Sequence, residues 1–330
     1  MGDRRLDNLL EVKNLTVDFG GEAGTARAIS NLSFHVEHNE ALGIVGESGS
    51  GKSVTSLAVM RLLPRAGVRV QGEILFHGAD LLRLSEREMQ SVRGKEIAMI
   101  FQEPMTSLNP VHTCGRQIAE AIRLHTDATR KEAMEQALRL LELCEIPDAR
   151  QRLKEYPHQL SGGMRQRVMI AIALACDPAL LIADEPTTAL DVTIQAQILE
   201  LMKDIRRRKS MGIIMITHDL GLVSDFCDRV VVVYTGEVVE VAPVRDLFRA
   251  PRHPYTEGLI GALPKMGRPN GRLEVIEGMV PDLDKMPAGC HFHPRCRYAT
   301  ARCRQEHPPL TSTPDGRAVR CFLRENGGDA

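Results

Sequence analysis

Several short segments of this 330-residue chain combine residue types that handle phosphate groups and water. The first is a glycine-rich loop that ends in lysine and serine: Gly46, Glu47, Ser48, Gly49, Ser50, Gly51, Lys52 and Ser53. Its glycines let backbone amides turn toward phosphate oxygens, Lys52 can reach the β- and γ-phosphates, and the Ser53 hydroxyl is a ligand for Mg²⁺. The loop follows an apolar run and precedes a helical pattern, so it predicts a site for a nucleoside triphosphate.

Two later segments add acid–base groups. Asp184 and Glu185 follow the apolar run 180–183, and His218 follows the apolar run 213–217. Parallel strands end at one edge of their sheet, so we expect these side chains to emerge near the phosphate loop. Asp184 then suits Mg²⁺, Glu185 can polarise an attacking water, and His218 can reach the γ-phosphate.

A second anion site is predicted at Ser161, Gly162 and Gly163. Ser161 can cap the helix that follows, while the two glycines leave its first amides bare. An ordinary capped helix needs at most one glycine. One chain does not need two phosphate cradles for one nucleotide, unless each cradle serves a different nucleotide across a dimer.

The elements that must position these groups alternate between strands and helices, which predicts an α/β fold with a parallel sheet. We expect strands at 9–19, 29–36, 40–45, 73–76, 97–101, 180–183 and 213–217, helices at 53–63, 164–175 and 194–208, and a hairpin at 230–241. Residues 108–165 carry helical periodicity, with a helix at 130–144, and read as a helical insertion. Proline becomes frequent past residue 250, so we expect domains at 1–250 and 251–330.

Composition narrows the classes of function. The formal net charge is −1, aromatic residues make up 4% and tryptophan is absent, so nothing points to a nucleic-acid partner. We expect no signal peptide, and no apolar run reaches the roughly 20 residues of a membrane span. The expected location is the cytosol or the cytosolic side of a membrane.

The eight cysteines fall into two groups. Cys114, Cys144, Cys176 and Cys227 are scattered and read as small buried hydrophobic residues. The other four, spaced C-x5-C-x6-C-x17-C, crowd into the last 41 residues: Cys290, Cys296, Cys303 and Cys321. A reducing compartment disfavours disulfides. The spacing lacks the short knuckle of most zinc sites, so an iron–sulfur cluster is favoured over zinc and over free or buried thiols. His291 and His293 read as loop residues rather than ligands.

Taken together, these motifs resemble the nucleotide-binding subunit of ABC transporters over about residues 8–250. The resemblance implies a P-loop ABC-type ATPase domain with a RecA-like parallel-sheet core, an antiparallel β subdomain and a helical subdomain. It also implies that Phe19 stacks on adenine, that Gln102 links Mg²⁺ and water to the membrane subunits, and that Asp191 communicates across an ATPase dimer. Two residues depart from the usual pattern: Met164 stands in place of Gln, and Glu103 in place of Asp.

Longer stretches are similar to the dipeptide/oligopeptide importer subfamily, namely 46–53, 101–110, 156–164, 252–256 and the Cys- and Pro-rich tail. That resemblance implies ATP, Mg²⁺ and a [4Fe-4S] cluster as cofactors. A structural role is favoured over a redox or iron-sensing role, because a short Pro-rich tail buries little core by itself. It implies a bacterial importer at the cytoplasmic face of the inner membrane, with a second ATPase subunit, often a different chain, two membrane permeases and an extracytoplasmic peptide-binding protein.

The sequence motifs are also compatible with other functions of ABC ATPases. The same machinery can carry nickel or glutathione. Soluble ABC ATPases of DNA repair carry a long coiled coil where this chain has about sixty residues, and those of translation carry two cassettes. An iron–sulfur regulator with a vestigial ATPase is disfavoured because Lys52, Asp184, Glu185 and His218 are all present.

Overall fold

The strand that leads into the phosphate loop and the strand that ends at Asp184 belong to two different units of the chain. The phosphate-loop unit comprises Leu10–His35, Ala41–Leu82 and Met215–Ala330, and the helical unit comprises Met1–Leu9, Val36–Glu40 and Arg83–Ile214. The computed structural model describes residues 8–21, 24–102, 107–188, 190–263, 275–313 and 315–324. The Cys-rich tail therefore belongs to the same unit as the phosphate loop.

An antiparallel sheet opens the phosphate-loop unit, with strand order β2-β1-β4-β5. Its strands are β1 (Leu10–Gly21), β2 (Gly24–Val36), β4 (Val68–Phe76) and β5 (Ala79–Asp80). β1 and β4 pair from Leu10 opposite Phe76 to Phe19 opposite Val68, with an irregularity between Lys13 and Thr16. Alternating burial along β1 matches the alternating sequence pattern, so the expected half-buried strands are confirmed.

The second sheet of this unit carries the phosphate loop, in the order β11-β12-β10-β9-β3. The strands are β3 (Ala41–Val45), β9 (Arg229–Tyr234), β10 (Glu237–Pro243), β11 (Thr311–Ser312) and β12 (Ala318–Val319). β3 and β9 are parallel, and β9 and β10 form the expected antiparallel hairpin. β12 then pairs with β10, so the tail extends this sheet.

Short helices flank these strands. They are α1 (Lys52–Val59), α9 (Leu220–Phe226), α10 (Val244–Arg249), α11 (Pro254–Gly261) and α12 (Ala301–Gln305), with 3₁₀ turns at Leu81–Arg83, His293–Arg295 and Phe322–Arg324. α9 packs tightly on β3: a Cβ at Gly43 would lie 3.0 Å from Val223 Cγ1. A larger residue at Gly43 would push this helix off the strand.

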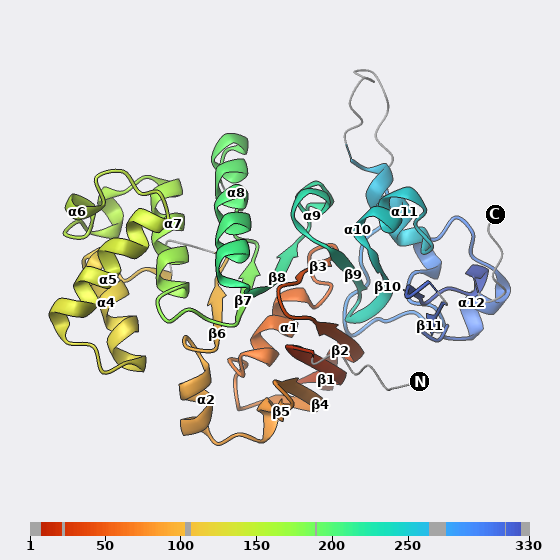
Figure 1. The fold of residues 1–330 in the computed structure, drawn as a ribbon. Coiled ribbons are helices and arrows are strands. Elements are labelled where there is room, and N and C mark those ends of the chain that lie inside the picture. The colour runs from red at the N-terminus through yellow and green to blue at the C-terminus, as the bar shows by residue number, and fades with distance from the viewer. Residues whose placement is uncertain are drawn as a thin grey trace, which may run out of the picture. The chain divides into compact units, whose positions relative to one another are not determined.

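The helical unit contains the insertion that the sequence predicts. Its helices are α2 (Glu86–Val92), α4 (Cys114–His125), α5 (Arg130–Leu143), α6 (Ala149–Arg152), α7 (Gly162–Ala173) and α8 (Val192–Lys209), with a 3₁₀ turn at Pro157–Gln159. Figure 1 shows α4, α5, α6 and α7 gathered into one bundle, in which α5 turns a stripe including Ala133, Ala137 and Leu141 inward. The α5 boundaries match the predicted helix to within one residue.

The candidate site residues of the helical unit lie at the ends of two parallel strands. β6 (Ile97–Ile100) pairs with β7 (Leu180–Asp184) from Ile97 opposite Leu180 to Ile100 opposite Ala183. All five residues of β7 are buried, which explains its uninterrupted apolar sequence. The division between the two units falls within β8 (Gly212–Thr217).

Candidate active site

The phosphate loop connects β3 to α1, as its sequence predicts, and two of its glycines are sterically required. A Cβ at Gly46 would lie 2.2 Å from the Val233 carbonyl oxygen. Gly51 has a φ of +95°, and a Cβ there would lie 2.9 Å from the Ala28 carbonyl oxygen. Only glycine fits both positions, so the chain can make the tight turn that brings α1 directly after the loop.

Inside the loop, Lys52 is almost fully buried and its ammonium group is held by backbone carbonyls. Lys52 Nζ donates to the Gly46 carbonyl oxygen at 2.7 Å and to the Glu47 carbonyl oxygen at 2.9 Å. Ser53 follows on the exposed side of the first helical turn. The Ser50 hydroxyl is buried and, within the described residues, lacks a hydrogen-bond partner. These features fit a loop that donates hydrogen bonds to the phosphate oxygens of a ligand.

Phe19 and His218 belong to the same unit as the loop. Phe19 is partly exposed near the end of β1, and His218 is exposed directly after β8. Asp219 caps the next helix, with its Oδ1 accepting from the Gly221 amide at 2.7 Å. This cap fixes the first residue of α9. It therefore also restrains the position of His218, which directly precedes the cap.

In the helical unit, Asp184 and Glu185 lie at the end of β7, as predicted. Asp184 is buried, whereas Glu185 is partly exposed and has a φ of +47°, a strained value for a residue with a side chain. The Glu185 Oε2 atom accepts from Gln102 Nε2 at 3.1 Å and from the Thr188 hydroxyl at 2.9 Å. The turn after β7 therefore holds one carboxylate oxygen in a defined place, and Gln102 is brought to it from the end of β6.

The second predicted anion site caps α7 as expected. Ser161 Oγ accepts from the Met164 amide at 3.3 Å, and Ser161 is exposed. Gly163 has a second role that the sequence did not reveal, because a Cβ there would lie 2.8 Å from Ile194 Cγ2 on α8. Asp191 caps α8 by accepting from the Ile194 amide at 2.9 Å. Two exposed helix N-termini of this unit are thus packed together around Ile194.

Comparison with known proteins identifies families that contain a phosphate loop and an ATPase site of this kind. The family model described as "ABC transporter" matches residues 29–188, and the one described as "Oligopeptide/dipeptide transporter, C-terminal region" matches residues 239–303. The probable peptide ABC transporter ATP-binding protein y4tR of Sinorhizobium fredii is 54% identical over 321 residues, covering 96% of each chain. The chain belongs to the ATP-binding subunits of ABC transporters.

Two further relatives support this family and its fold. The dipeptide transport ATP-binding protein DppD of Escherichia coli is 51% identical over 313 residues, covering 95% of this chain and 96% of that protein. A solved dimeric structure of the ATP-binding cassette MJ0796, in a post-hydrolysis state bound to ADP and Pi, is 27% identical with a TM-score of 0.64. It covers 72% of this chain and 99% of that one. The predicted ABC-type α/β fold is therefore confirmed.

In this ABC subunit the four tail cysteines are free thiols of intermediate burial. The Cys290 amide donates to the Cys303 carbonyl oxygen at 2.8 Å. Burial and the proximity of the other three thiols raise the pKa of Cys321 to about 11, and burial raises the pKa of Cys290 and Cys296 as well. Among the described residues, the group of possible metal ligands whose donor atoms all lie within 4.8 Å of one another is Glu237, His291 and His307, and the four thiols form no such group.

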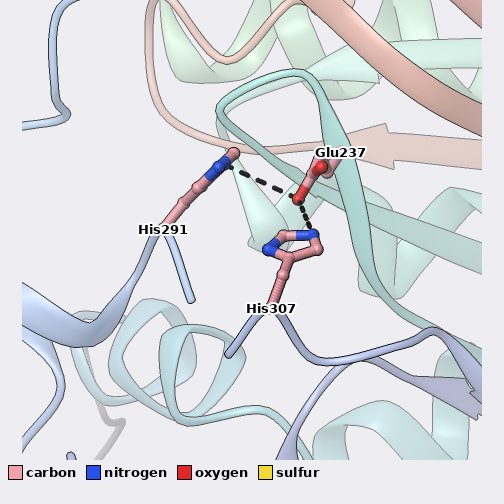
Figure 2. A group of neighbouring side chains, drawn as sticks. All are labelled: Glu237, His291 and His307. Carbon is pink, nitrogen blue, oxygen red and sulfur yellow. Dashed lines mark ion pairs between the residues drawn. The ribbon is translucent and has the colours of Figure 1, made fainter. Parts of the chain in front are cut away.

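Polar contacts between the tail and the hairpin of β9 and β10 were not predicted from the sequence. Figure 2 shows Glu237 between two histidines of the tail. Glu237 Oε2 lies 3.1 Å from His307 Nε2 and 3.6 Å from His291 Nδ1. The hydrogen bond to Glu237 raises the pKa of His307, and burial lowers that of His291. Thr235 and the nearby Arg320 complete this group, so it ties the tail to the sheet whether or not it binds an ion.

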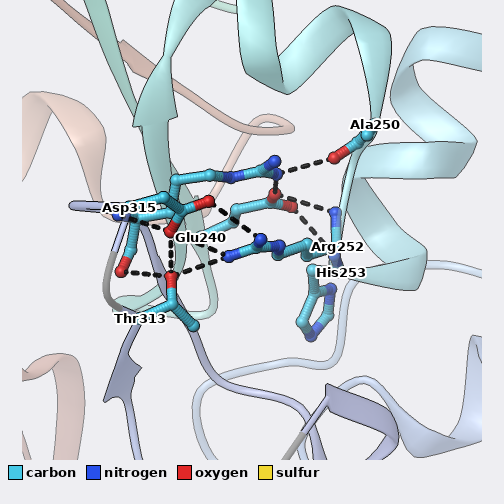
Figure 3. Close-up of polar contacts among 7 residues, drawn as sticks. Glu240, Ala250, Arg252, His253, Thr313 and Asp315 are labelled. Atoms are coloured by element: carbon cyan, nitrogen blue, oxygen red, sulfur yellow. Dashed lines mark hydrogen bonds and ion pairs between the residues drawn. The ribbon is translucent and has the colours of Figure 1, made fainter. Parts of the chain in front are cut away.

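A second network surrounds the fully buried Glu240 on β10 (Figure 3). Its carboxylate accepts from the amides of Arg252 and His253 at 2.8 and 2.9 Å and from Arg317 Nη2 at 2.9 Å. Arg252 in turn makes a two-pronged ion pair with Asp315. A buried carboxylate is costly unless its oxygens are bonded, so this network fixes the start of α11 and the end of the tail against β10.

The four scattered cysteines behave largely as expected: Cys114, Cys144 and Cys227 are buried and Cys176 is partly so. Among the described residues, no helix has the length and apolar character required to cross a bilayer.

Proposed function

We propose that this chain is the ATP-hydrolysing subunit of a bacterial importer that takes up di- and oligopeptides. The observation that carries the proposal is identity of 51% or more to peptide-transport ATP-binding proteins over nearly their whole length, with the C-terminal transporter region included. Uptake of nickel or glutathione by the same machinery is the weaker alternative, because no relative reported above is named for either solute.

The proposed roles of the site residues follow the chemistry of each group. Amides of the loop 46–51 and the Lys52 ammonium bind the phosphates of ATP, and Phe19 stacks on adenine. Ser53, Asp184 and Gln102 offer hydroxyl, carboxylate and amide oxygens, the donor types that Mg²⁺ prefers, so they would hold the metal that neutralises the phosphates.

Glu185 is proposed to accept the proton of the attacking water. Its Oε2 is already fixed by Gln102 and Thr188, so a general base can be held in place before the nucleotide arrives. His218 is proposed to contact the γ-phosphate and stabilise charge that develops there.

Ser161, Gly162 and Gly163 are proposed to bind the ATP held by a second ATPase subunit, with Asp191 near that interface. Support comes from the exposed, capped N-termini of α7 and α8 and from the dimeric form of the MJ0796 cassette. The partner ATPase, which we expect to be a different chain, would provide the same groups in return.

The remaining proposals concern the tail and the assembly. Cys290, Cys296, Cys303 and Cys321 would hold a [4Fe-4S] cluster whose role is to stabilise the tail, residues 251–330. Two transmembrane permeases and an extracytoplasmic peptide-binding protein would complete the importer, with this subunit at the cytoplasmic face of the inner membrane.

Copurification from native membranes tests this function. The tagged chain should bring down two permeases and a second ATPase, and the assembly in vesicles should take up a labelled dipeptide in an ATP-dependent way. Uptake of a metal ion or glutathione, with no uptake of peptide, would reject the proposed cargo. Recovery of the chain without any membrane protein would reject the importer itself.

A further inference from the structure

Glu47, the second residue of the phosphate loop, has all three of its polar groups bonded. Its amide donates to the Tyr255 hydroxyl at 2.8 Å, and its carbonyl oxygen accepts from Lys52 Nζ at 2.9 Å. Its carboxylate receives two hydrogen bonds from Arg295, at 2.6 Å from Nη1 and 3.0 Å from Nη2. Two of these three partners, Tyr255 and Arg295, come from the C-terminal extension, more than 200 residues later in the chain.

We propose that the C-terminal extension sets the geometry of the phosphate loop, with Arg295 and Tyr255 as positioning residues for the binding of ATP. The extension would thus be part of the nucleotide site, beyond any role in stabilising its own fold. This inference rests on the proposed role of the loop and Lys52 in binding MgATP.

The Arg295–Glu47 pair is built as a rigid contact. The Arg295 side chain is 4% exposed and that of Glu47 is 30% exposed. Arg295 Nε also donates to the Glu277 carbonyl oxygen at 3.0 Å, and its guanidinium carbon lies 5.9 Å from the centre of the Tyr234 ring. Two-pronged pairing between a guanidinium and a carboxylate fixes direction as well as distance. The pair therefore restricts where the Glu47 side chain and its peptide can move.

An aromatic cluster holds both positioning residues in place. The rings of Tyr234, Tyr255 and Phe292 lie 4.7 to 5.4 Å apart between centroids, and all three residues are at least 96% buried. Tyr234 ends β9, Tyr255 lies on α11, and Phe292 precedes Arg295 by three residues in the tail. Contacts between such rings are stabilising beyond the burial of their area, so a shift of the tail would disturb the loop.

The charges of Arg295 and Glu47 determine whether their contact favours or opposes the binding of ATP. A carboxylate within a phosphate loop repels the negative charge of ATP, and this repulsion is strong where water is partly excluded. Arg295 offsets the charge of Glu47 and draws its side chain toward the extension. At the same time, the Glu47 carbonyl oxygen shares the Lys52 ammonium, the group that is proposed to reach the phosphates. Loss of Arg295 should therefore weaken the binding of ATP through both charge and geometry.

Titration of the purified full-length chain with a fluorescent ATP analogue and Mg²⁺ tests the proposal. Arg295→Ala should raise the Kd about tenfold, and Tyr255→Phe, which keeps the ring but removes the acceptor for the Glu47 amide, should raise it about fivefold. Arg297→Ala is the matched control, because Arg297 is a neighbouring, more exposed arginine that pairs with Glu257 instead. It should leave the Kd within twofold of the wild type.

A second substitution separates positioning from a general loss of stability. In the Arg295→Ala background, Glu47→Gln removes the uncompensated carboxylate and should recover at least half of the lost affinity on a logarithmic scale. A destabilised tail alone would not be rescued in this way. Arg295→Lys, which keeps the charge and loses the two-pronged geometry, should fall between Arg295→Ala and the wild type.

Unchanged nucleotide affinity in both Arg295→Ala and Tyr255→Phe would overturn the proposal, as would a failure of Glu47→Gln to rescue Arg295→Ala. If Arg295→Ala does not fold, Tyr255→Phe and Arg295→Lys decide the matter by the same measurement. Lys52→Ala separates this inference from the function on which it rests. If Lys52→Ala also binds normally, the loop is not the nucleotide site, whereas if only Lys52→Ala fails to bind, the extension has no positioning role.

Discussion

Gln102 Nε2 donates to Glu185 Oε2 over 3.1 Å, although the two residues are 83 positions apart in the sequence. The bond joins the end of β6 to the end of β7, and the Thr188 hydroxyl donates to the same oxygen. The carboxylate that we propose as the general base is therefore held by two neutral donors.

Thr188 provides a test of this positioning. Thr188→Val keeps the shape of the side chain and removes the donor to Glu185, so kcat for ATP hydrolysis should fall about fivefold, corresponding to about 1 kcal/mol for one hydrogen bond. KM for ATP should stay within twofold, because Thr188 is not proposed to bind the nucleotide. Thr188→Ser restores the hydroxyl and should restore most of kcat. Near-normal kcat in Thr188→Val, with a loss confined to Thr188→Ser, would contradict a role for the hydroxyl.

Ser161→Arg tests the proposed action on a partner's nucleotide. A bulky cation at the exposed N-terminus of α7 should lower hydrolysis by the assembled ATPase pair about 100-fold, while binding of ATP at Lys52 of the same chain is retained. The measurements are ATPase rate and nucleotide titration on the same preparation.

The matched control for Ser161 is Thr129→Arg. Thr129 caps α5 in the same helical unit and is likewise exposed, with its hydroxyl accepting from the Glu132 amide at 3.3 Å. This variant loses a comparable cap and should retain near-normal hydrolysis. Full activity of a demonstrably monomeric Ser161→Arg preparation would contradict a site shared between two subunits.

The tail is expected to hold iron. Protein purified without oxygen should be brown and contain iron and acid-labile sulfide in near-equal amounts. Cys296→Ser should lose both and should make the tail more sensitive to protease, whereas Cys176→Ser, which changes a cysteine outside the group of four, should keep them. Stoichiometric zinc with no labile sulfide would contradict the cluster, even if the tail remained folded.

The buried His253 should make the stability of the folded chain fall at acidic pH. The imidazole caps α11, accepting from the Tyr255 amide at 3.0 Å, and burial lowers its pKa to about 3. The unfolded chain then binds more protons than the folded chain between about pH 6.5 and pH 3. This contribution to stability is fully present above pH 6.5 and is lost as the pH falls toward 3.

His253→Asn keeps a capping side chain that cannot become charged. The difference in Tm between the wild type and this variant should shrink as the pH is lowered from 8 to 5, because only the wild type loses stability by protonation at this site. His38→Asn, at an exposed loop position, is the control and should show no such trend. A difference that stays constant across this range would contradict the prediction.

Sequence reasoning succeeded where the signal is local. The loop 46–53, the Ser161 cap and the apolar strand before Asp184 each follow from residue types within about ten positions, and the structure forms them as predicted. Periodicity also identified α5 and the hairpin of β9 and β10.

The contacts of the tail could not be predicted in this way. Arg317 pairs with Glu240 across 77 positions, and Arg295 pairs with Glu47 across 248. Nothing in the spacing of one charge identifies a partner so far away, and β12 has only two residues, too few to show an alternating pattern. The one available signal was Glu47 itself, since a carboxylate inside a phosphate loop needs a cation nearby to offset its charge.

Glu185→Gln tests most directly whether ATP hydrolysis by this chain drives transport. Gln can still accept from Gln102 and Thr188, so the local geometry is kept while the proton acceptor is lost. In the assembled transporter, we predict unchanged binding of MgATP, a kcat at least 100-fold lower, and an equal loss of labelled-dipeptide uptake into vesicles. Near-normal hydrolysis would contradict the proposed role of Glu185, and peptide uptake that persists without hydrolysis would contradict transport driven by this ATPase.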